Sequence, residues 1–223
     1  LSLVGSEMCI RDSYGTGKTE VSVNLALALA AEGEQVMLAD LDIVNPYFRS
    51  RERRPLLEKA GVRVISSSQA CSDADVPALP AELLTILENR EIRGILDIGG
   101  DPVGARVLAR FQPKIVQEDY QLIFVLNANR PEVRDAESAA AYLRSIEAVT
   151  GLTCSGLVNN THLCGETTPA EIRKGAALAQ EVSRQTGIPI LCHTAERRFL
   201  ESLSDLGEPV FPIAINMKKP WER

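Results

Sequence analysis

Apolar residues follow two spacings along the chain, and the change from one to the other predicts where helices and strands lie. Spacings of three and four residues predict helices with a buried face, whereas short apolar runs between turn residues predict buried strands. One predicted helix begins near Lys18 and stops near Gly33, and others cover residues 80–89, 104–111, 131–150, 169–186 and 197–204. The predicted strands cover residues 35–41, 63–66, 93–98, 121–126, 154–159, 188–192 and 210–215.

This alternation predicts an α/β fold, a three-layer, doubly wound and mostly parallel sheet with helices on both faces. The 223 residues are 45% hydrophobic and 24% charged, which fits one domain. The net charge is -6, and Lys and Arg are scattered, so we expect no direct binding of nucleic acid.

The expected location is the cytoplasm. Five cysteines are widely spaced and form no C-x-x-C pair, a pattern typical of free thiols in a reducing compartment. No apolar run approaches the roughly 20 residues that a transmembrane helix needs.

The first thirteen residues, LSLVGSEMCIRDS, are interpreted as a non-native tail because they resemble a translated sequencing-adapter segment. A genuine N-terminal arm is the alternative. The native domain is then expected to be a single unit over residues 14–223, with its first strand missing or replaced, since no run of four to eight apolar residues precedes Tyr14.

The segment Gly15-Thr16-Gly17-Lys18-Thr19 has the form of a phosphate-binding loop. Gly15 and Gly17 allow the backbone to approach a phosphate at the N-terminus of the following helix. Lys18 would reach the β and γ phosphates, and the Thr19 hydroxyl would bind the magnesium ion that bridges them. The pattern G-x-x-x-x-G-K-[ST] also has a glycine where this chain has Asp12, inside the suspected tail.

Carboxylates end two of the predicted strands, at the edge where open α/β sheets bind ligands. Asp40 and Asp42 share one side of their strand end, and a nearby metal would offset their repulsion; solvated strand-end acids are the alternative. Asp97 begins a D-x-x-G pattern in which it would hold magnesium while the Gly100 amide senses the γ phosphate.

Asn159, at the end of a further strand, can both donate to and accept from a purine edge, and we prefer it to Asn160 as the base-binding residue. A turn residue is the alternative. The N-K-x-D pattern of guanine recognition is absent, so ATP is predicted rather than GTP.

From Tyr14 to about Trp221 the chain resembles the MinD/ParA/CobQ-type nucleotide-binding domains, above all in the run DLDIVNPYFR over residues 40–49. The resemblance implies a P-loop ATPase in which Asp42 orients the attacking water and Asp40 and Asp97 support magnesium. It also places Asn45 and Arg49 in a moving switch. The full predicted nucleotide-binding set is Gly15, Thr16, Gly17, Lys18, Thr19, Glu20, Gly100 and Asn159, with Lys18 and Asp42 catalytic.

The resemblance departs from the family at one signature, a second lysine near the start of the loop, where this chain has Ser13 followed by Tyr14. Dimerisation around the nucleotide is therefore left open. The leading hypothesis is a magnesium-dependent switch with slow ATP hydrolysis that acts on an unidentified protein partner. An ATP-dependent biosynthetic enzyme of the dethiobiotin-synthetase or cobyrinate-amidating kind and a non-hydrolysing adapter are the alternatives.

We predict that this chain binds ATP more weakly than a version in which an apolar strand and a glycine precede Ser13, because the suspected tail interrupts both features. Calorimetric titration of the two chains with ATP and magnesium measures the difference. Equal affinities would show the tail to be harmless.

Overall fold

The computed structural model describes residues 7–11, 15–42, 50–66, 82–99 and 102–217. Its strands are β1 (Glu7–Arg11), β2 (Gln35–Asp40), β3 (Arg63–Ser66), β4 (Ile92–Asp97), β5 (Tyr120–Leu126), β6 (Cys154–Asn159), β7 (Ile190–Glu196) and β8 (Val210–Ile213). Its α-helices are α1 (Lys18–Ala31), α2 (Arg54–Lys59), α3 (Glu82–Glu88), α4 (Pro102–Ile115), α5 (Ala136–Thr150) and α6 (Pro169–Thr186). Short 3-10 helices lie at Ser50–Arg53 (η1), Pro131–Val133 (η3), Cys164–Glu166 (η4), Arg197–Phe199 (η5) and Glu201–Leu203 (η6).

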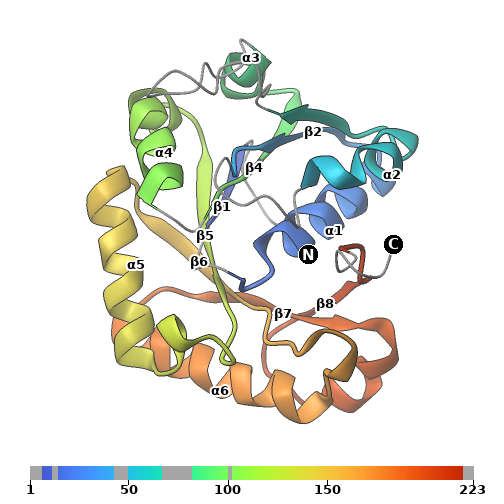
Figure 1. Cartoon of the computed structure of the whole chain (residues 1–223), viewed down its shortest axis with the longest axis vertical. Helices are drawn as coiled ribbons and strands as arrows, with labels where there is room; N and C mark the ends of the chain where they lie inside the picture. The colour runs from blue at the N-terminus through green and yellow to red at the C-terminus, as the bar shows by residue number, and fades with distance from the viewer. Residues whose placement is uncertain (1–6, 12–14, 43–49, 67–81, 100–101, 218–223) are drawn as a thin grey trace.

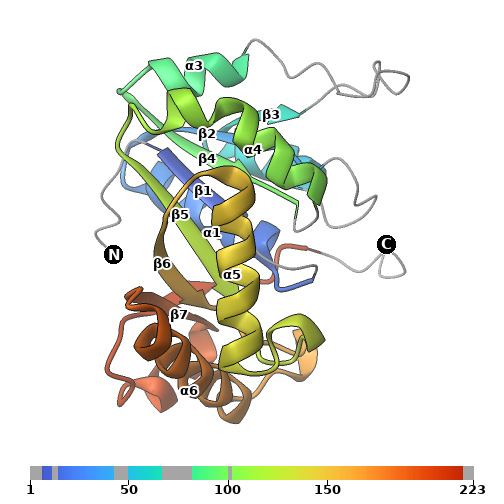
Figure 2. The same cartoon turned by 90° about the vertical axis from the view of Figure 1, so that its left-hand side faces the viewer.

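The described strands form one parallel sheet in the order β3-β2-β4-β1-β5-β6-β7-β8. Helices α1 and α2 cover one face, and α4 and α5 cover the other (Figures 1 and 2). Successive residues of β5 supply both cores, because Leu122, Phe124 and Leu126 pack on the second face and Ile123 and Val125 on the first. The predicted three-layer, doubly wound architecture is therefore confirmed.

The centre of the sheet differs from the sequence-based expectation. Residues Glu7–Arg11 form β1 and pair in parallel with both β4 and β5, so of the two expectations, a missing or a replaced first strand, the first is wrong and replacement by the suspected tail stays a prediction. Because β1 lies between β4 and β5, its backbone amides and carbonyls can pair on both sides whatever its side chains are. An apolar run of four residues is therefore not required for this strand to form. The sheet has a strand immediately before the phosphate loop; the foreign origin of residues 1–13 stays a prediction.

Local sequence signals explain where the two long helices of the second face begin and end. Asp135 has extended backbone angles and accepts a hydrogen bond from the Ser138 amide, so α5 begins after it instead of running on from the predicted start at Pro131. Gly151 and Gly187 end α5 and α6 in the left-handed conformation that glycine adopts readily.

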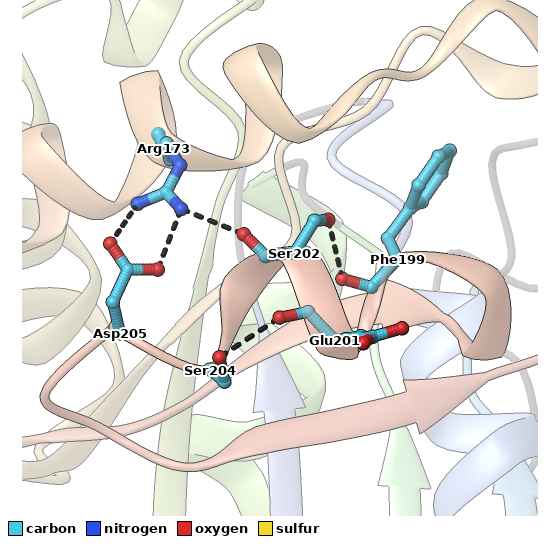
Figure 3. A network of polar contacts seen from close by, with 6 residues as sticks. All are labelled: Arg173, Phe199, Glu201, Ser202, Ser204 and Asp205. Carbon is cyan, nitrogen blue, oxygen red and sulfur yellow. Dashed lines mark hydrogen bonds and ion pairs between the residues drawn. The ribbon is translucent and has the colours of Figure 1, made fainter.

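Helix α6 is fastened to the segment that follows β7. Arg173 donates to both carboxylate oxygens of Asp205, at 2.6 and 2.8 Å, and to the Ser202 carbonyl (Figure 3). The pair is exposed and its net stabilisation is therefore small, although the two parallel bonds make the contact directional. On the buried side of the same helix, Gly175 lies against Asn159 and Thr161 at the end of β6.

We predict that Gly175→Ala destabilises the protein by about 1 to 3 kcal/mol, because the added Cβ would overlap the side chains of Thr161 and Asn159. Urea unfolding measures the change. Gly207→Ala is the matched control, since open space surrounds that position and it should change stability by less than about 0.5 kcal/mol. Equal stability of the two variants would mean that α6 does not pack as closely on β6 as described.

Candidate functional site

Two glycines shape the loop that leads into α1. Gly15 has φ of 80° and Gly17 has φ of 86°, a region that side chains other than glycine rarely adopt. Gly17 is also the N-cap of α1, and no described side chain caps the helix. The amides of the first helical turn thus face the loop without a capping oxygen, an arrangement that binds anions such as phosphate.

The first turn of α1 carries the predicted lysine and threonine toward the ends of β2 and β4. Lys18 is buried, its positive charge acts on Asp97, and the Thr19 side chain hydrogen-bonds the Asp97 carboxylate. Asp40 and Asp97 are partners in the register of β2 with β4, so their Cα positions are adjacent. The structure therefore brings together four of the residues that the sequence analysis selected.

The two strand-end carboxylates repel each other in a buried environment. Burial, followed by the charge of Asp40, raises the pKa of Asp97 to about 7, although Lys18 and Thr19 act in the opposite direction. The Asp97 Oδ2 atom is buried and has no hydrogen-bond partner in the described part of the chain. Burial raises the pKa of Asp40 to about 6, and the charge of Asp42 contributes to the increase at both groups.

This donor set fits magnesium. An unpartnered carboxylate oxygen next to a second carboxylate and a hydroxyl suits a hard cation that prefers oxygen ligands. Within the described ranges no three His, Cys, Asp or Glu side chains converge as a ligand group. Mg²⁺ does not require such a group, because it commonly uses one or two carboxylates with phosphate and water oxygens.

The Asp40 carboxylate also makes local contacts. Its oxygens accept from the Asp42 amide at 3.3 Å and the Arg51 amide at 3.2 Å, and Arg51 Nε lies 3.8 Å away. Asp40 therefore joins the residues on either side of the segment 43–49. Asn45 and Arg49, which the sequence analysis assigned to a switch, lie outside the described residues.

Asn160 braces the loop from the end of β6. Its Nδ2 donates to the Thr16 carbonyl at 2.8 Å, and its Oδ1 accepts from the Thr194 hydroxyl on β7. The space where a Gly17 side chain would project is filled by Asn160 and His162. This brace explains why glycine is required at position 17 for packing as well as for its backbone angles.

Asn159, the residue preferred for base recognition, is fully buried in the same region. Its Nδ2 donates to the Ile172 carbonyl and to His193 Nδ1, and its Oδ1 accepts from the Thr161 amide. Base binding by Asn159 stays a prediction, and it would require these internal bonds to be exchanged.

Two residues that sequence reasoning did not select lie against the loop. Arg130, after β5, donates from Nε to the Gly15 carbonyl at 2.7 Å. His162 lies next to Gly17, and burial, followed by the charge of Arg130, lowers its pKa to about 4. Both follow strand ends at the loop edge of the sheet, which is the one sequence signal that could have identified them.

Glu20 holds the other end of the described chain. Its carboxylate accepts from the Asn216 and Met217 amides at 2.8 and 2.9 Å, and burial raises its pKa. Nucleotide contact by Glu20 therefore stays a prediction. Gly100, Asp12, Ser13 and Tyr14 lie outside the described residues.

Comparison with known proteins identifies the family of this fold. The model of the CobQ/CobB/MinD/ParA nucleotide-binding domain matches residues 13–210. No curated protein matches the chain. The match covers well over half of the sequence, including the loop and the acids Asp40, Asp42 and Asp97.

Solved structures share the fold at low sequence identity. The cell division protein FtsY from Thermotoga maritima matches with a TM-score of 0.56 and 21% identity, over 87% of this chain and 63% of that chain. The signal recognition particle 54 kDa protein from Aeropyrum pernix, solved with GDP, matches with a TM-score of 0.54 and 23% identity, over 82% and 40%. A nucleotide-binding protein from Archaeoglobus fulgidus, solved with ADP, matches with a TM-score of 0.52 and 18% identity, over 91% and 86%. This chain thus spans less than two thirds of the first two proteins.

We predict that Asp97→Asn stabilises the protein in magnesium-free buffer at pH 8 by about 1 to 3 kcal/mol, because it removes a buried charge. A raised folded-state pKa means that the stability contributed by Asp97 is present below its ordinary value of 3.8 and is lost as the pH rises to about 7. The advantage of the variant should therefore grow over that range and then level off.

Urea unfolding at several pH values measures this effect. Glu132→Gln, at an exposed carboxylate of η3, is the control and should change stability little at any pH. A destabilised Asp97→Asn protein at pH 8 would show that Lys18 and Thr19 fully compensate the buried charge.

Proposed function

The chain belongs to the family of CobQ/CobB/MinD/ParA nucleotide-binding domains, and we propose that it is a magnesium-dependent ATP-binding switch that hydrolyses ATP slowly. One observation carries the proposal. A loop with two left-handed glycines begins a helix whose Lys18 acts on the buried carboxylate of Asp97, which has an unpartnered oxygen and lies next to Asp40. Backbone amides for an anion and oxygens for a cation thus lie on two sides of one site.

In this proposal the loop binds the phosphates. The amides at the start of α1 would donate to phosphate oxygens, and the Lys18 ammonium would neutralise the β and γ phosphates. Lys18 is already buried, so less side-chain entropy is lost when the phosphates bind. Asn160 and Arg130 hold the carbonyls of Thr16 and Gly15, which keeps the loop in its binding shape.

Thr19, Asp40 and Asp97 would hold Mg²⁺, which supplies charge neutralisation of the β and γ phosphates when it is bound. The cation would also give the Asp97 Oδ2 atom the partner that the described chain does not provide. Asp42, half-buried and two residues beyond the end of β2, is proposed to orient the attacking water.

We propose ATP as the nucleotide on the basis of sequence. In the segment 159–162, Asn160 and His162 stand where the guanine-reading pattern N-K-x-D has lysine and aspartate. Among the structural relatives, one was solved with ADP and another with GDP, so both purines belong in the test. A cytoplasmic location is proposed from the cysteines, of which Cys154, Cys164 and Cys192 are free thiols. No described helix is both long and apolar enough to cross a bilayer.

We predict that Lys18→Ala reduces the affinity for ATP at least about 100-fold, because it removes a buried cation from a polyanion site. Calorimetric titration with ATP and with GTP, each with magnesium, measures the affinity. Phosphate release from the same samples measures turnover, which we expect to be slow and specific for ATP.

Lys59→Ala, at an exposed lysine in the last turn of α2, is the matched control and should bind as the unaltered chain does. Preferential binding of GTP would reject the choice of nucleotide, and absence of both would reject the site. Turnover that rises sharply with a small carboxylic acid would identify a biosynthetic enzyme in place of a switch, and binding without turnover an adapter.

A further inference from the structure

Arg130 follows β5 and lies against the phosphate loop, and it forms no ion pair with any carboxylate in the part of the chain that the structure describes. Its Nε donates to the Gly15 carbonyl at 2.7 Å, and its Cζ lies 2.9 Å from the point where a Cβ of Gly15 would be. The side chain is only partly exposed. A guanidinium has five N–H donors, so a single bond to a carbonyl leaves most of its donors and all of its charge for another partner.

The backbone around Arg130 is fixed by several hydrogen bonds. The Arg130 amide donates to the Asn127 carbonyl at 2.9 Å, and the Asn129 amide donates to the Asn127 side chain at 3.0 Å. The Asn129 side chain in turn contacts Glu171 and Lys174 on α6. Pro131 follows directly and restricts its own φ. The guanidinium therefore starts from an anchored position, which reduces the entropy lost when it binds a ligand.

The charges around the loop are unevenly distributed. Asp40, Asp42 and Asp97 lie toward β2 and β4, on one side of β1, whereas Arg130 follows β5 on the other side. The positive charge of Lys18 acts on Asp97, so this carboxylate offsets part of the charge before any nucleotide binds. A nucleotide phosphate chain entering this site would meet three carboxylates, and a second cation on the opposite side would offset them.

We infer that Arg130 binds the phosphate chain of the nucleotide from the β5 side of the loop, opposite the magnesium-binding carboxylates. The inference rests on the proposed function and adds a second phosphate-binding cation to Lys18. This cation belongs to the same chain as the loop.

The test compares Arg130→Gln, which removes the charge, with Arg130→Lys, which keeps it. Calorimetry with magnesium-ATP at several salt concentrations should show an affinity about tenfold or more lower for Arg130→Gln, with a weaker dependence on salt. Arg130→Lys should keep most of the salt dependence, because it retains the charge. Arg134→Gln, at an exposed arginine four residues away that pairs with Asp135, is the matched control and should bind as the unaltered chain does.

A second measurement locates the guanidinium without nucleotide. The chain has only two histidines, His162, which is half-buried, and His193, which is buried. The titration of His162 can therefore be followed by NMR with a single other histidine to distinguish it from. Arg130→Gln should raise the pKa of His162, because the neighbouring positive charge is lost. An unchanged His162 pKa would overturn the inference by showing that the guanidinium does not lie beside the loop.

Three binding results are also decisive. Unaltered affinity of Arg130→Gln, with binding abolished in Lys18→Ala, would overturn this inference and leave the proposed function intact. Equal weakening of Arg130→Gln and Arg130→Lys with unchanged salt dependence would reduce Arg130 to a support for the Gly15 carbonyl and also overturn it. Failure of the unaltered chain to bind either nucleotide would overturn the proposed function and this inference together.

Discussion

Parallel pairing of β2 with β4 places Asp40 and Asp97 in adjacent register positions, and the remaining features of the site depend on this forced proximity of two buried carboxylates. The two carboxylates differ in the contacts that offset their repulsion. Arg51 and two backbone amides partly offset the burial of the Asp40 charge, whereas Asp97 is left with Lys18, Thr19 and one oxygen that has no partner in the described chain. In the proposed function a cation would supply the missing partner of this oxygen, so that a cost in the stability of the metal-free fold would be recovered as affinity for the cation.

The phosphate loop is held mainly by residues far away in the sequence. Asn160 binds the Thr16 carbonyl and is itself bonded by Thr194, while Arg130 binds the Gly15 carbonyl. Asn160 directly follows β6, Thr194 lies within β7, and Arg130 lies in the loop after β5, so the loop is held by three neighbouring segments of the sheet. Gly175 allows α6 to pack closely on Asn159 and Thr161, the residues on either side of Asn160.

Hydrophobic spacing was sufficient to predict the alternation of helices and strands, and the limits of β3, β6 and α6 match their expected ranges. Hydrophobic spacing did not predict α2, because Leu57 is the one buried residue among its six and a helical period cannot be seen. It also did not predict β1, whose position depends on backbone pairing with two distant strands. In the candidate site, Lys18, Thr19, Asp40 and Asp97 could be grouped because parallel strands end at one edge. Arg130 follows β5 at the same edge but was not selected, because its contact with Gly15 joins residues 115 positions apart and leaves no local pattern.

The position of β1 also bears on how the protein acquires its binding site. β1 is synthesised before either of its neighbours, and it pairs with Ile92–Asp97 and Tyr120–Leu126. The loop that follows it is braced by residues from still later strands. Contacts of such high sequence separation form late and slow the search for the native state. During synthesis on the ribosome, β1 and the loop after it emerge first. They can reach the conformation described here only after β4, β5, β6 and β7 have also emerged.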